Sequence, residues 1–435
     1  MTDPQVGIFA IGILFVLIAL RVPIAVALTG VPFFGIWYLI NMKAAVGALK
    51  VIPYSFAANW LVSSVPMFLL MGYLAYHTGI TKGLFNAARI WMSRLPGGLA
   101  IASVMGASGF AAVTGSSVAC AAAMGRIAVP EMLKHKYDAG LATGTVAAAG
   151  TIGALIPPSI LFIIFGVIAS VPIGDLFVGG AVAGLMTAFS YIVVILLRAG
   201  LTPGLVPKVT EHFPLAVRLK VLLEITPVLI LALLVFGGLF SGLFTPTEAG
   251  AIGATFCALI AFFRGTLSWT AIKASVSESL TTTAAIFVIA IGANLLSKFV
   301  AISEADKLIS DMVVAAGSSQ AMLMFGIVVI YLILGMFLDP LGAMLLTMPI
   351  ILPVVRDAGM DMVWFGVVLA KLLEIGMITP PVGLNVFVLK SVVGDEVSIG
   401  TIFRGVMYFL LADMVVVWLL IAYPDIVLWF VRLLH

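Results

Sequence analysis

Long apolar runs separated by short charged stretches restrict the fold of this sequence more than any other feature. Of the 435 residues, 63% are AVILMFWYC and only 9% are Asp, Glu, Lys or Arg. A water-soluble chain with so little charge could not cover its own surface, whereas about 20 apolar residues suffice to cross the hydrocarbon core of a bilayer. The sequence therefore predicts an all-α polytopic protein embedded in a lipid bilayer.

The same composition excludes several classes of protein. The formal charge of +3 is small and dispersed, which argues against nucleic acid as a partner. Cys120 and Cys257 lie in separate apolar stretches and the histidines are scattered, so neither a disulfide framework nor a transition-metal site is expected. The sequence contains no nucleotide-binding fingerprint and no nucleophile–base motif. We therefore expect a protein that is not an enzyme and needs no cofactor.

An internal repeat with a shift of 223 residues predicts two homologous halves, about 1–210 and 220–435. Seven residues of the first half, mostly Pro, Gly and Asp, have partners of the same type at this shift. They are Pro23, Gly30, Pro130, Asp138, Gly153, Pro157 and Pro158, which match Pro246, Gly253, Pro353, Asp361, Gly376, Pro380 and Pro381. Repeats of this kind are the usual construction of secondary transporters.

The charges of two corresponding loops indicate that the halves have opposite orientations. Loop 81–94 has a net charge of +3, whereas loop 301–311 has a net charge of −2. Cytoplasmic loops are enriched in Lys and Arg, so the first loop is predicted to be cytoplasmic and the second external. The result is an inverted repeat with about ten transmembrane helices. A parallel duplication is the alternative interpretation.

Each half contains two consecutive prolines inside an apolar segment, Pro157-Pro158 and Pro380-Pro381. Each proline removes a backbone donor, and its ring clashes with a carbonyl one turn earlier, so the helices are expected to unwind around Ile156 and Thr379. Unwound backbone at membrane depth must be buried or line a polar cavity. Its carbonyls, with Ser or Thr hydroxyls, are suitable ligands for a small cation. The two breaks thus predict two cation sites near the midplane, with structural kinks as the alternative.

Two further segments, about 97–130 and 319–353, are predicted to be re-entrant hairpins. Their tips align at the same shift and contain Gly115-Ser116-Ser117 and Leu338-Asp339-Pro340. Helix ends at such tips attract ions, and small side chains allow a ligand to approach. Packing of helices through small residues is the alternative. Asp339 lies in an apolar run, where a charge costs roughly 2.5–3.5 kcal/mol, so it is expected to face a cavity or a cation.

One further pair of charges lies within an apolar segment. Glu374 follows Lys371 by three residues, so the two side chains are expected to pair on one face of a helix. The pair is either structural or takes part in ion coupling.

Three segments together resemble a known family. They are Gly-Leu-Phe-Thr-Pro-Thr-Glu-Ala-Gly-Ala (242–251), Ile-Pro-Pro-Ser-Ile-Leu-Phe-Ile-Ile-Phe-Gly (156–166) and Glu-Ile-Gly-Met-Ile-Thr-Pro-Pro-Val-Gly-Leu-Asn (374–385). The sequence resembles the large membrane (permease) subunit of tripartite ATP-independent periplasmic (TRAP) transporters, which are similar to the ion-transporter superfamily. The resemblance implies sodium-driven uptake of an organic acid, such as a C4-dicarboxylate or a sialic acid, across a bacterial inner membrane. It also implies two protein partners, a periplasmic substrate-binding protein and a small four-helix membrane subunit.

The resemblance also assigns residues to two sites. The implied sodium ligands lie at the first hairpin tip, at both helix breaks and at Asp339. They are Gly115, Ser116, Ser117, Gly153, Ile156, Pro157, Asp339, Gly376 and Thr379. The implied substrate-binding residues are Ser117, Ser159, Asp339 and Asn385. Two other functions remain as alternatives, a stand-alone ion-coupled carboxylate carrier and, less favoured, a membrane-embedded enzyme.

Together the repeat and the resemblance divide the chain into scaffold and elevator-type transport regions. The scaffold and its arms would comprise residues 1–96 and 219–318. The transport regions would be 97–170 and 319–395, each with its hairpin followed by a broken helix at 138–170 or 362–392. Residues 171–218 would form a closing helix and a cytoplasmic linker, and 396–435 the C-terminal helix.

Overall fold

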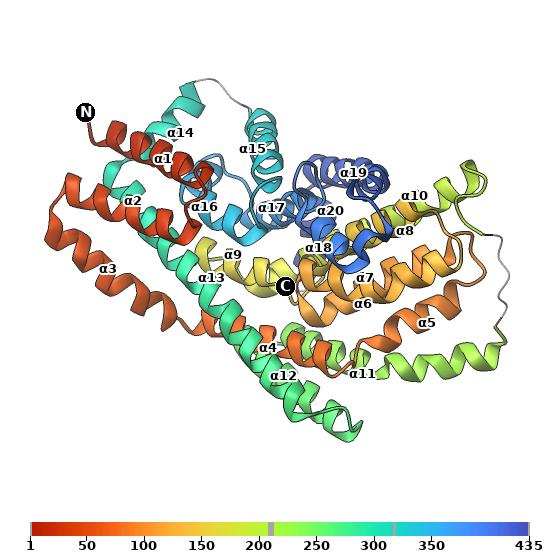
Figure 1. The fold of residues 1–435 in the computed structure, drawn as a ribbon. Coiled ribbons are helices and arrows are strands. Elements are labelled where there is room, and N and C mark those ends of the chain that lie inside the picture. Colours follow the sequence, from red (N-terminus) through yellow and green to blue (C-terminus); the bar gives the residue numbers. More distant parts are fainter. Residues whose placement is uncertain (1, 208–212, 316–318, 434–435) are drawn as a thin grey trace.

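The computed structural model describes residues 2–207, 213–315 and 319–433. Within these ranges the chain forms α-helices and short 3-10 turns, with no β-strand, which confirms the predicted all-α class (Figure 1). The first half contains α1 Asp3–Ala19, α2 Ile24–Leu39, α3 Met42–Ala57, α4 Ser64–His77, α5 Lys82–Met92, α6 Gly98–Thr114, α7 Ser117–Lys134, α8 Ala139–Gly150, α9 Ile160–Ala169 and α10 Ile173–Leu201. The second contains α11 Leu215–Phe240, α12 Pro246–Phe263, α13 Trp269–Ser303, α14 Ala305–Ala315, α15 Gln320–Gly335, α16 Pro340–Asp357, α17 Met362–Gly376, α18 Leu384–Val393, α19 Ile399–Ala422 and α20 Asp425–Leu433.

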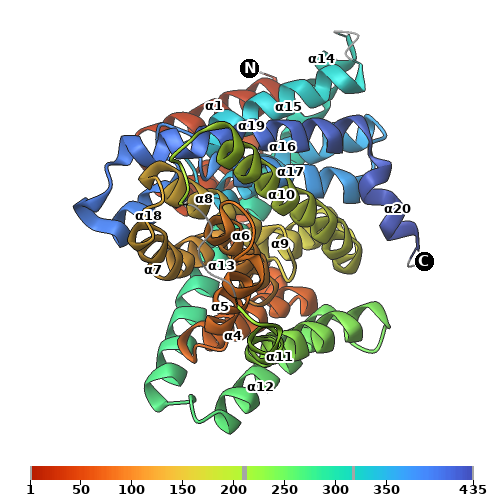
Figure 2. The same ribbon diagram turned by 90° about the vertical axis from the view of Figure 1, so that its right-hand side faces the viewer.

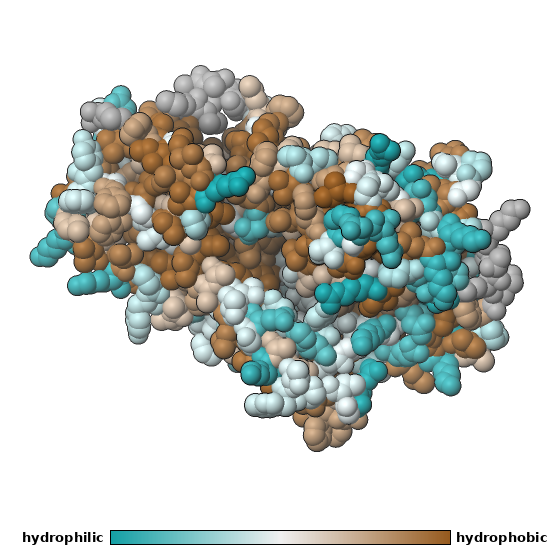
Figure 3. Space-filling model, viewed as in Figure 1, coloured by the Kyte–Doolittle hydropathy of each residue, from teal (hydrophilic) through white to brown (hydrophobic). Residues whose placement is uncertain are grey.

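The surface of the molecule matches a lipid environment. Seven helices among the described residues are long and apolar enough to cross a membrane. Large apolar side chains on several of them are exposed, including Phe189 on α10, Leu233 on α11 and Phe263 on α12. In Figure 3 apolar residues gather on the left, over α1 and α2, and hydrophilic residues are more frequent on the right. A protein with such an apolar surface is suited to a lipid bilayer and not to water.

Residues 223 positions apart begin corresponding helices in the two halves. Asp138 accepts a hydrogen bond from the backbone of Leu141 at 2.8 Å and caps α8, while Asp361 caps α17 in the same way. The side chains of Ser116 and Asp339 likewise cap α7 and α16. A side chain that accepts from the free N–H groups of the first turn fixes where a helix begins. The matched caps explain why both halves have helices in the same register.

The helices that carry the breaks lie deepest in the molecule. Every residue of α8 from Gly140 onward is buried, and so is α17 from Trp364 to Gly376. Helix α8 packs against α6, α7, α18 and α19, which surround it in Figures 1 and 2. A β-carbon on Gly144 would collide with the backbone of Gly405, so α8 and α19 meet backbone to backbone. The first broken segment, 155–159, is buried throughout, whereas the second is exposed at Pro381.

Helix α13 is the longest of the described helices, with 35 residues. It crosses the molecule diagonally in Figure 1 and packs against α2, α4 and α16. It therefore contacts elements from both halves of the chain.

Candidate functional site

Both proline pairs lie in non-helical segments, as their chemistry predicts. Helix α8 continues into the 3-10 turn η2 (Thr151–Ala154), and the chain is then irregular over 155–159 until α9 begins. Residues 377–383 separate α17 from α18 in the second half. Some carbonyls of the last turns are satisfied by nearby hydroxyls, because Ser159 Oγ donates to Ala154 O at 2.6 Å and Thr379 Oγ1 to Ile375 O at 2.7 Å. These hydroxyls therefore stabilise the breaks.

The first hairpin tip lies directly on the first break. Gly115 has a φ of +61°, in the left-handed region that favours glycine. A β-carbon there would collide with the carbonyl oxygen of Pro158. A β-carbon on Gly153 would lie 2.8 Å from the carbonyl oxygen of Ser116. These close backbone contacts explain the glycines and bring two of the predicted sodium-binding segments together.

The second hairpin packs on the second break through another pair of glycines. A β-carbon on Gly335, at the end of α15, would lie 2.9 Å from the Cα atom of Gly376. The chain then reaches Asp339, whose Oδ2 accepts from the backbone of Gly342 at 2.9 Å and caps α16. The side chain of Asp339 is half-buried.

A cavity of about 150 Å³ lies between the two hairpin tips. It combines residues from both tips with residues beside both breaks. Its lining comprises Gly115, Ser116, Ser117, Val118, Ala154, Ile160, Leu161, Asp339, Pro340, Leu341, Glu374, Met377 and Leu384. Two carboxyl groups line it, and the lining among the described residues contains no Lys, Arg or His. The cavity is thus suited to a cation.

Glu374 connects the second broken helix to the first hairpin. Its Oε2 accepts a hydrogen bond from the hydroxyl of Ser117 at 2.5 Å, and both side chains are buried. Its other carboxylate oxygen, Oε1, is also buried and has no hydrogen-bond partner among the described residues. One oxygen of this side chain is therefore left for a ligand.

Lys371 has a different partner from the one expected. Its Nζ lies 2.5 Å from Oδ1 of Asp413 on α19, and both side chains are fully buried. This ion pair replaces the one expected between Lys371 and Glu374. Spacing along a helix places side chains on one face, but it does not show which carboxylate from a neighbouring helix approaches that face more closely.

Tyr191 of α10 completes a buried polar cluster around Asp413. Its hydroxyl lies 2.9 and 2.8 Å from the two carboxylate oxygens, and 3.1 Å from Oγ1 of Thr151 in η2. Sequence reasoning missed Asp413 and Tyr191. The available signal was an acid in the middle of the apolar run 402–430, a position where charge is costly and usually paired.

The structure gathers only part of the expected site around the cavity. The predicted residues that line it are Gly115, Ser116, Ser117, Asp339 and Glu374. The others lie in or beside the breaks without lining it, namely Gly153, Ile156, Pro157, Ser159, Gly376, Thr379 and Asn385. Asn385 is buried in α18 and its Nδ2 donates to the carbonyl oxygen of Ala147 at 3.4 Å, while its Oδ1 has no partner among the described residues.

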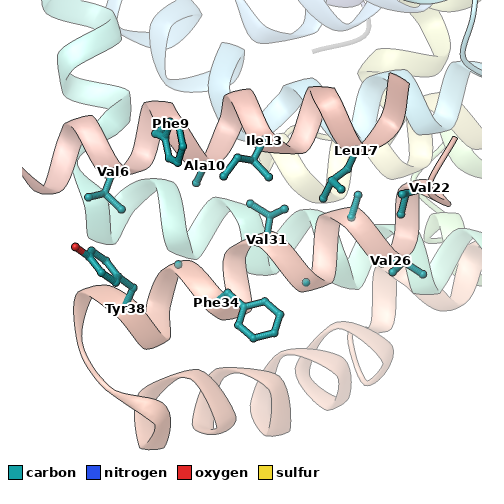
Figure 4. Close-up of a pocket in the computed structure, with 13 residues that line it drawn as sticks. Val6, Phe9, Ala10, Ile13, Leu17, Val22, Val26, Val31, Phe34 and Tyr38 are labelled. Atoms are coloured by element: carbon teal, nitrogen blue, oxygen red, sulfur yellow. The ribbon is translucent and has the colours of Figure 1, made fainter. Parts of the chain in front are cut away.

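Two other pockets differ in character. One of about 310 Å³ lies between α4 and α7 and is lined by Tyr73, Tyr76, Thr114, Ser116 and Glu278, among others. It shares Ser116 and Val118 with the acidic cavity. The other, of about 650 Å³, lies between α1 and α2 and is lined by apolar side chains such as Phe9, Ile13 and Phe34 (Figure 4). Its composition is suited to lipid and not to a charged solute.

The profile of one family, described as the DctM component of the tripartite ATP-independent periplasmic transporters, matches residues 11–426. The chain belongs to this DctM family. It is similar to a C4-dicarboxylate TRAP transporter large permease protein of Pseudomonas aeruginosa, with 33% identity over 80% of this chain and 82% of the relative. It is also similar to a sialic acid TRAP transporter large permease protein of Vibrio cholerae, with 31% identity over 85% and 86%.

The fold has a solved counterpart. The YdaH transporter of Alcanivorax borkumensis superposes with a TM-score of 0.57 at 16% identity, over 89% of this chain and 90% of that one. Membership of the DctM family makes the chain a multi-pass permease of the inner membrane and not an enzyme. The tripartite composition of the family implies a periplasmic binding protein and a small membrane subunit as partners.

The contact between Gly335 and Gly376 gives a first test of the site in this DctM-family permease. Gly376→Ala places a methyl group against the backbone of Gly335. We expect this overpacking to lower the free energy of unfolding by about 1–3 kcal/mol. Thermal melting of the purified protein measures the effect. Gly326→Ala on α15 is the matched control, because its β-carbon meets open space, and equal melting temperatures for the two variants would contradict the close contact.

Proposed function

We propose that this chain is the large permease subunit of a sodium-driven importer of an organic acid. The observation that carries the proposal is the acidic cavity between the two hairpin tips, with both breaks beside it. Hydroxyl, carboxylate and carbonyl oxygens are the ligands that a hard cation such as Na⁺ requires. The cation sites expected of an inverted-repeat transporter are built in the same way, from broken helices near the midplane.

The charges of the cavity support an ion-coupled mechanism. An organic anion that enters it meets the carboxyl groups of Asp339 and Glu374 and no positive side chain. A bound cation offsets this repulsion, so cation and substrate favour each other's binding. Each net positive charge that moves inward across 100 mV contributes roughly 2.3 kcal/mol. A surplus of sodium over substrate charge therefore drives accumulation.

The adjoining pocket is the more suitable place for the body of the substrate. It has about twice the volume of the acidic cavity, 310 against 150 Å³. Tyr73, Tyr76 and Thr114 line it together with the acidic Glu278, and Arg126 lies near it with its Nη1 3.3 Å from the hydroxyl of Tyr76. Ser116 lines both spaces and would lie between cation and substrate. The names of the two relatives support a C4-dicarboxylate or a sialic acid as the substrate class.

In the proposed mechanism the two hairpins and broken helices move as an elevator against the scaffold. The close glycine contacts between each hairpin and its break support this grouping, because they leave little room for independent movement. A periplasmic binding protein would deliver the substrate, and a small four-helix membrane subunit would brace the scaffold.

Uptake by the reconstituted complex tests the function. The permease and its small subunit are placed in proteoliposomes, and candidate binding proteins loaded with labelled organic acids are added under imposed sodium, proton or voltage gradients. We expect uptake only with a binding protein and an inward sodium gradient. Uptake of free substrate without any binding protein would favour a stand-alone carrier. Uptake driven by a proton gradient alone would overturn the sodium assignment.

A further inference from the structure

We propose that Glu374 is itself a ligand of the coupling cation, bound through Oε1. This assignment rests on the proposed sodium-coupled function and extends it to a residue outside the expected sodium-binding set. The starting point is that Glu374 lines the acidic cavity and that its Oε1 is buried without a hydrogen-bond partner among the described residues. A buried carboxylate oxygen without a partner costs free energy, and a bound cation removes that cost.

The charges of the buried groups around Glu374 also support it as the cation ligand. The described charged groups buried beside it are Lys371 on its own helix and Asp413 on α19. Lys371 and Asp413 form an ion pair at 2.5 Å and neutralise each other. If all three groups are ionised, one negative charge remains, and it belongs to Glu374. One monovalent cation compensates it.

Lys371 cannot easily serve as that counterion. Its ammonium group is held by Asp413, whose two oxygens are both within 2.9 Å of the Tyr191 hydroxyl. A move of Lys371 toward Glu374 would leave Asp413 buried without its cation, which is strongly destabilising. The three-residue cluster thus keeps the lysine away from the cavity.

Ser117 orients Glu374 for the same role. Its hydroxyl donates to Oε2 at 2.5 Å, which fixes the carboxylate between the first hairpin and the second broken helix. Oε1 then remains for the cation. Because Ser117 and Glu374 come from different halves of the chain, a cation bound here joins the two halves.

The test measures sodium binding to the purified permease by thermal stabilisation, with choline replacing sodium at constant ionic strength. Glu374→Gln keeps the size of the side chain and an oxygen that can accept from Ser117, but it removes the charge and presents an amide group. We expect the sodium concentration for half-maximal stabilisation to rise at least about tenfold, equivalent to roughly 1.4 kcal/mol. Glu248→Gln, in the exposed cap of α12, is the control and should behave as the wild type.

A second variant separates a ligand from a structural residue. Glu374→Asp keeps the charge but withdraws the carboxylate, so we expect a changed preference between Li⁺ and Na⁺. If Glu374→Gln is stabilised by sodium with the same half-maximal concentration as the wild type, the assignment is overturned. An unchanged preference between Li⁺ and Na⁺ in Glu374→Asp would overturn it as well. If the wild type itself gains no stability from sodium over choline, the sodium-coupled function fails as a whole. Stabilisation of the wild type and of Glu374→Gln alike refutes only the role of Glu374.

Discussion

Asp413→Asn is expected to lower the free energy of unfolding by about 3–5 kcal/mol, the usual cost of removing one partner from a buried ion pair. The substitution leaves the Lys371 ammonium group fully buried without its carboxylate, and it also weakens the two contacts to the Tyr191 hydroxyl. The melting temperature of the purified permease measures the loss. Asp425→Asn is the matched control, because Asp425 pairs with Arg432 at 3.2 Å on the exposed surface, where ion pairs contribute little.

A double variant distinguishes charge from packing in this cluster. Lys371→Met with Asp413→Leu removes both charges and keeps much of the buried volume. Replacement of a buried ion pair by apolar side chains is often neutral or stabilising, so we expect the double variant to melt well above Asp413→Asn. A double variant no more stable than the single one would show that the loss comes from packing.

Asp339→Ala and Thr379→Ala are each expected to abolish sodium-driven uptake in proteoliposomes while the protein stays folded. Asp339 contributes a carboxyl group to the acidic cavity. Thr379 holds the end of α17 at the second break through its hydrogen bond to Ile375 O at 2.7 Å. Loss of the Asp339 cap costs only about 1 kcal/mol, so unfolding does not account for the expected loss of transport.

Two conservative variants show which property of each side chain matters. Asp339→Asn retains an oxygen for the cap to Gly342 and removes the charge, so uptake should still be lost. Thr379→Ser retains the hydroxyl and should transport. Full transport by both alanine variants would remove these residues from the mechanism, and full transport by Asp339→Asn would reduce Asp339 to a helix cap.

Local chemistry explains which features could be predicted from the sequence. Pro157-Pro158 and Pro380-Pro381 each remove two successive backbone donors and lie outside helices, whereas the single prolines Pro130 and Pro353 are accommodated inside α7 and α16. Ser116 and Asp339 begin helices because their side chains accept from the next turn. The breaks and the helix starts at both tips followed from these local rules together with the repeat. The meeting of Ser116, Ser117 and Asp339 at one cavity did not, because the repeat predicted two separate cation sites.

Tertiary neighbours explain what could not be predicted. Spacing on α17 suggested Glu374 as the partner of Lys371, but Asp413 lies 42 residues away in the chain and reaches Lys371 only through the packing of α17 on α19. Ser159 was expected to bind substrate, and the structure adds a local bond that the sequence did not show, from its hydroxyl to Ala154 O. Such outcomes depend on which helices meet, and one sequence without relatives does not specify that.

The length of α13 has a consequence for the membrane around the protein. A helix of 35 residues is about 52 Å long, whereas hydrocarbon is about 30 Å thick. Its first part contains Lys273 and Glu278, and only the stretch after Thr283 is strongly apolar, so the first part should lie at the interface. There Thr282 hydrogen-bonds to Tyr73 of α4, and Glu278 hydrogen-bonds to His77 of α4. Both contacts lie beside the pocket of about 310 Å³ between α4 and α7. A bilayer of different thickness would change the tilt of α13 and thereby reshape that pocket. The length of the lipid chains should therefore alter the apparent affinity for the transported substrate.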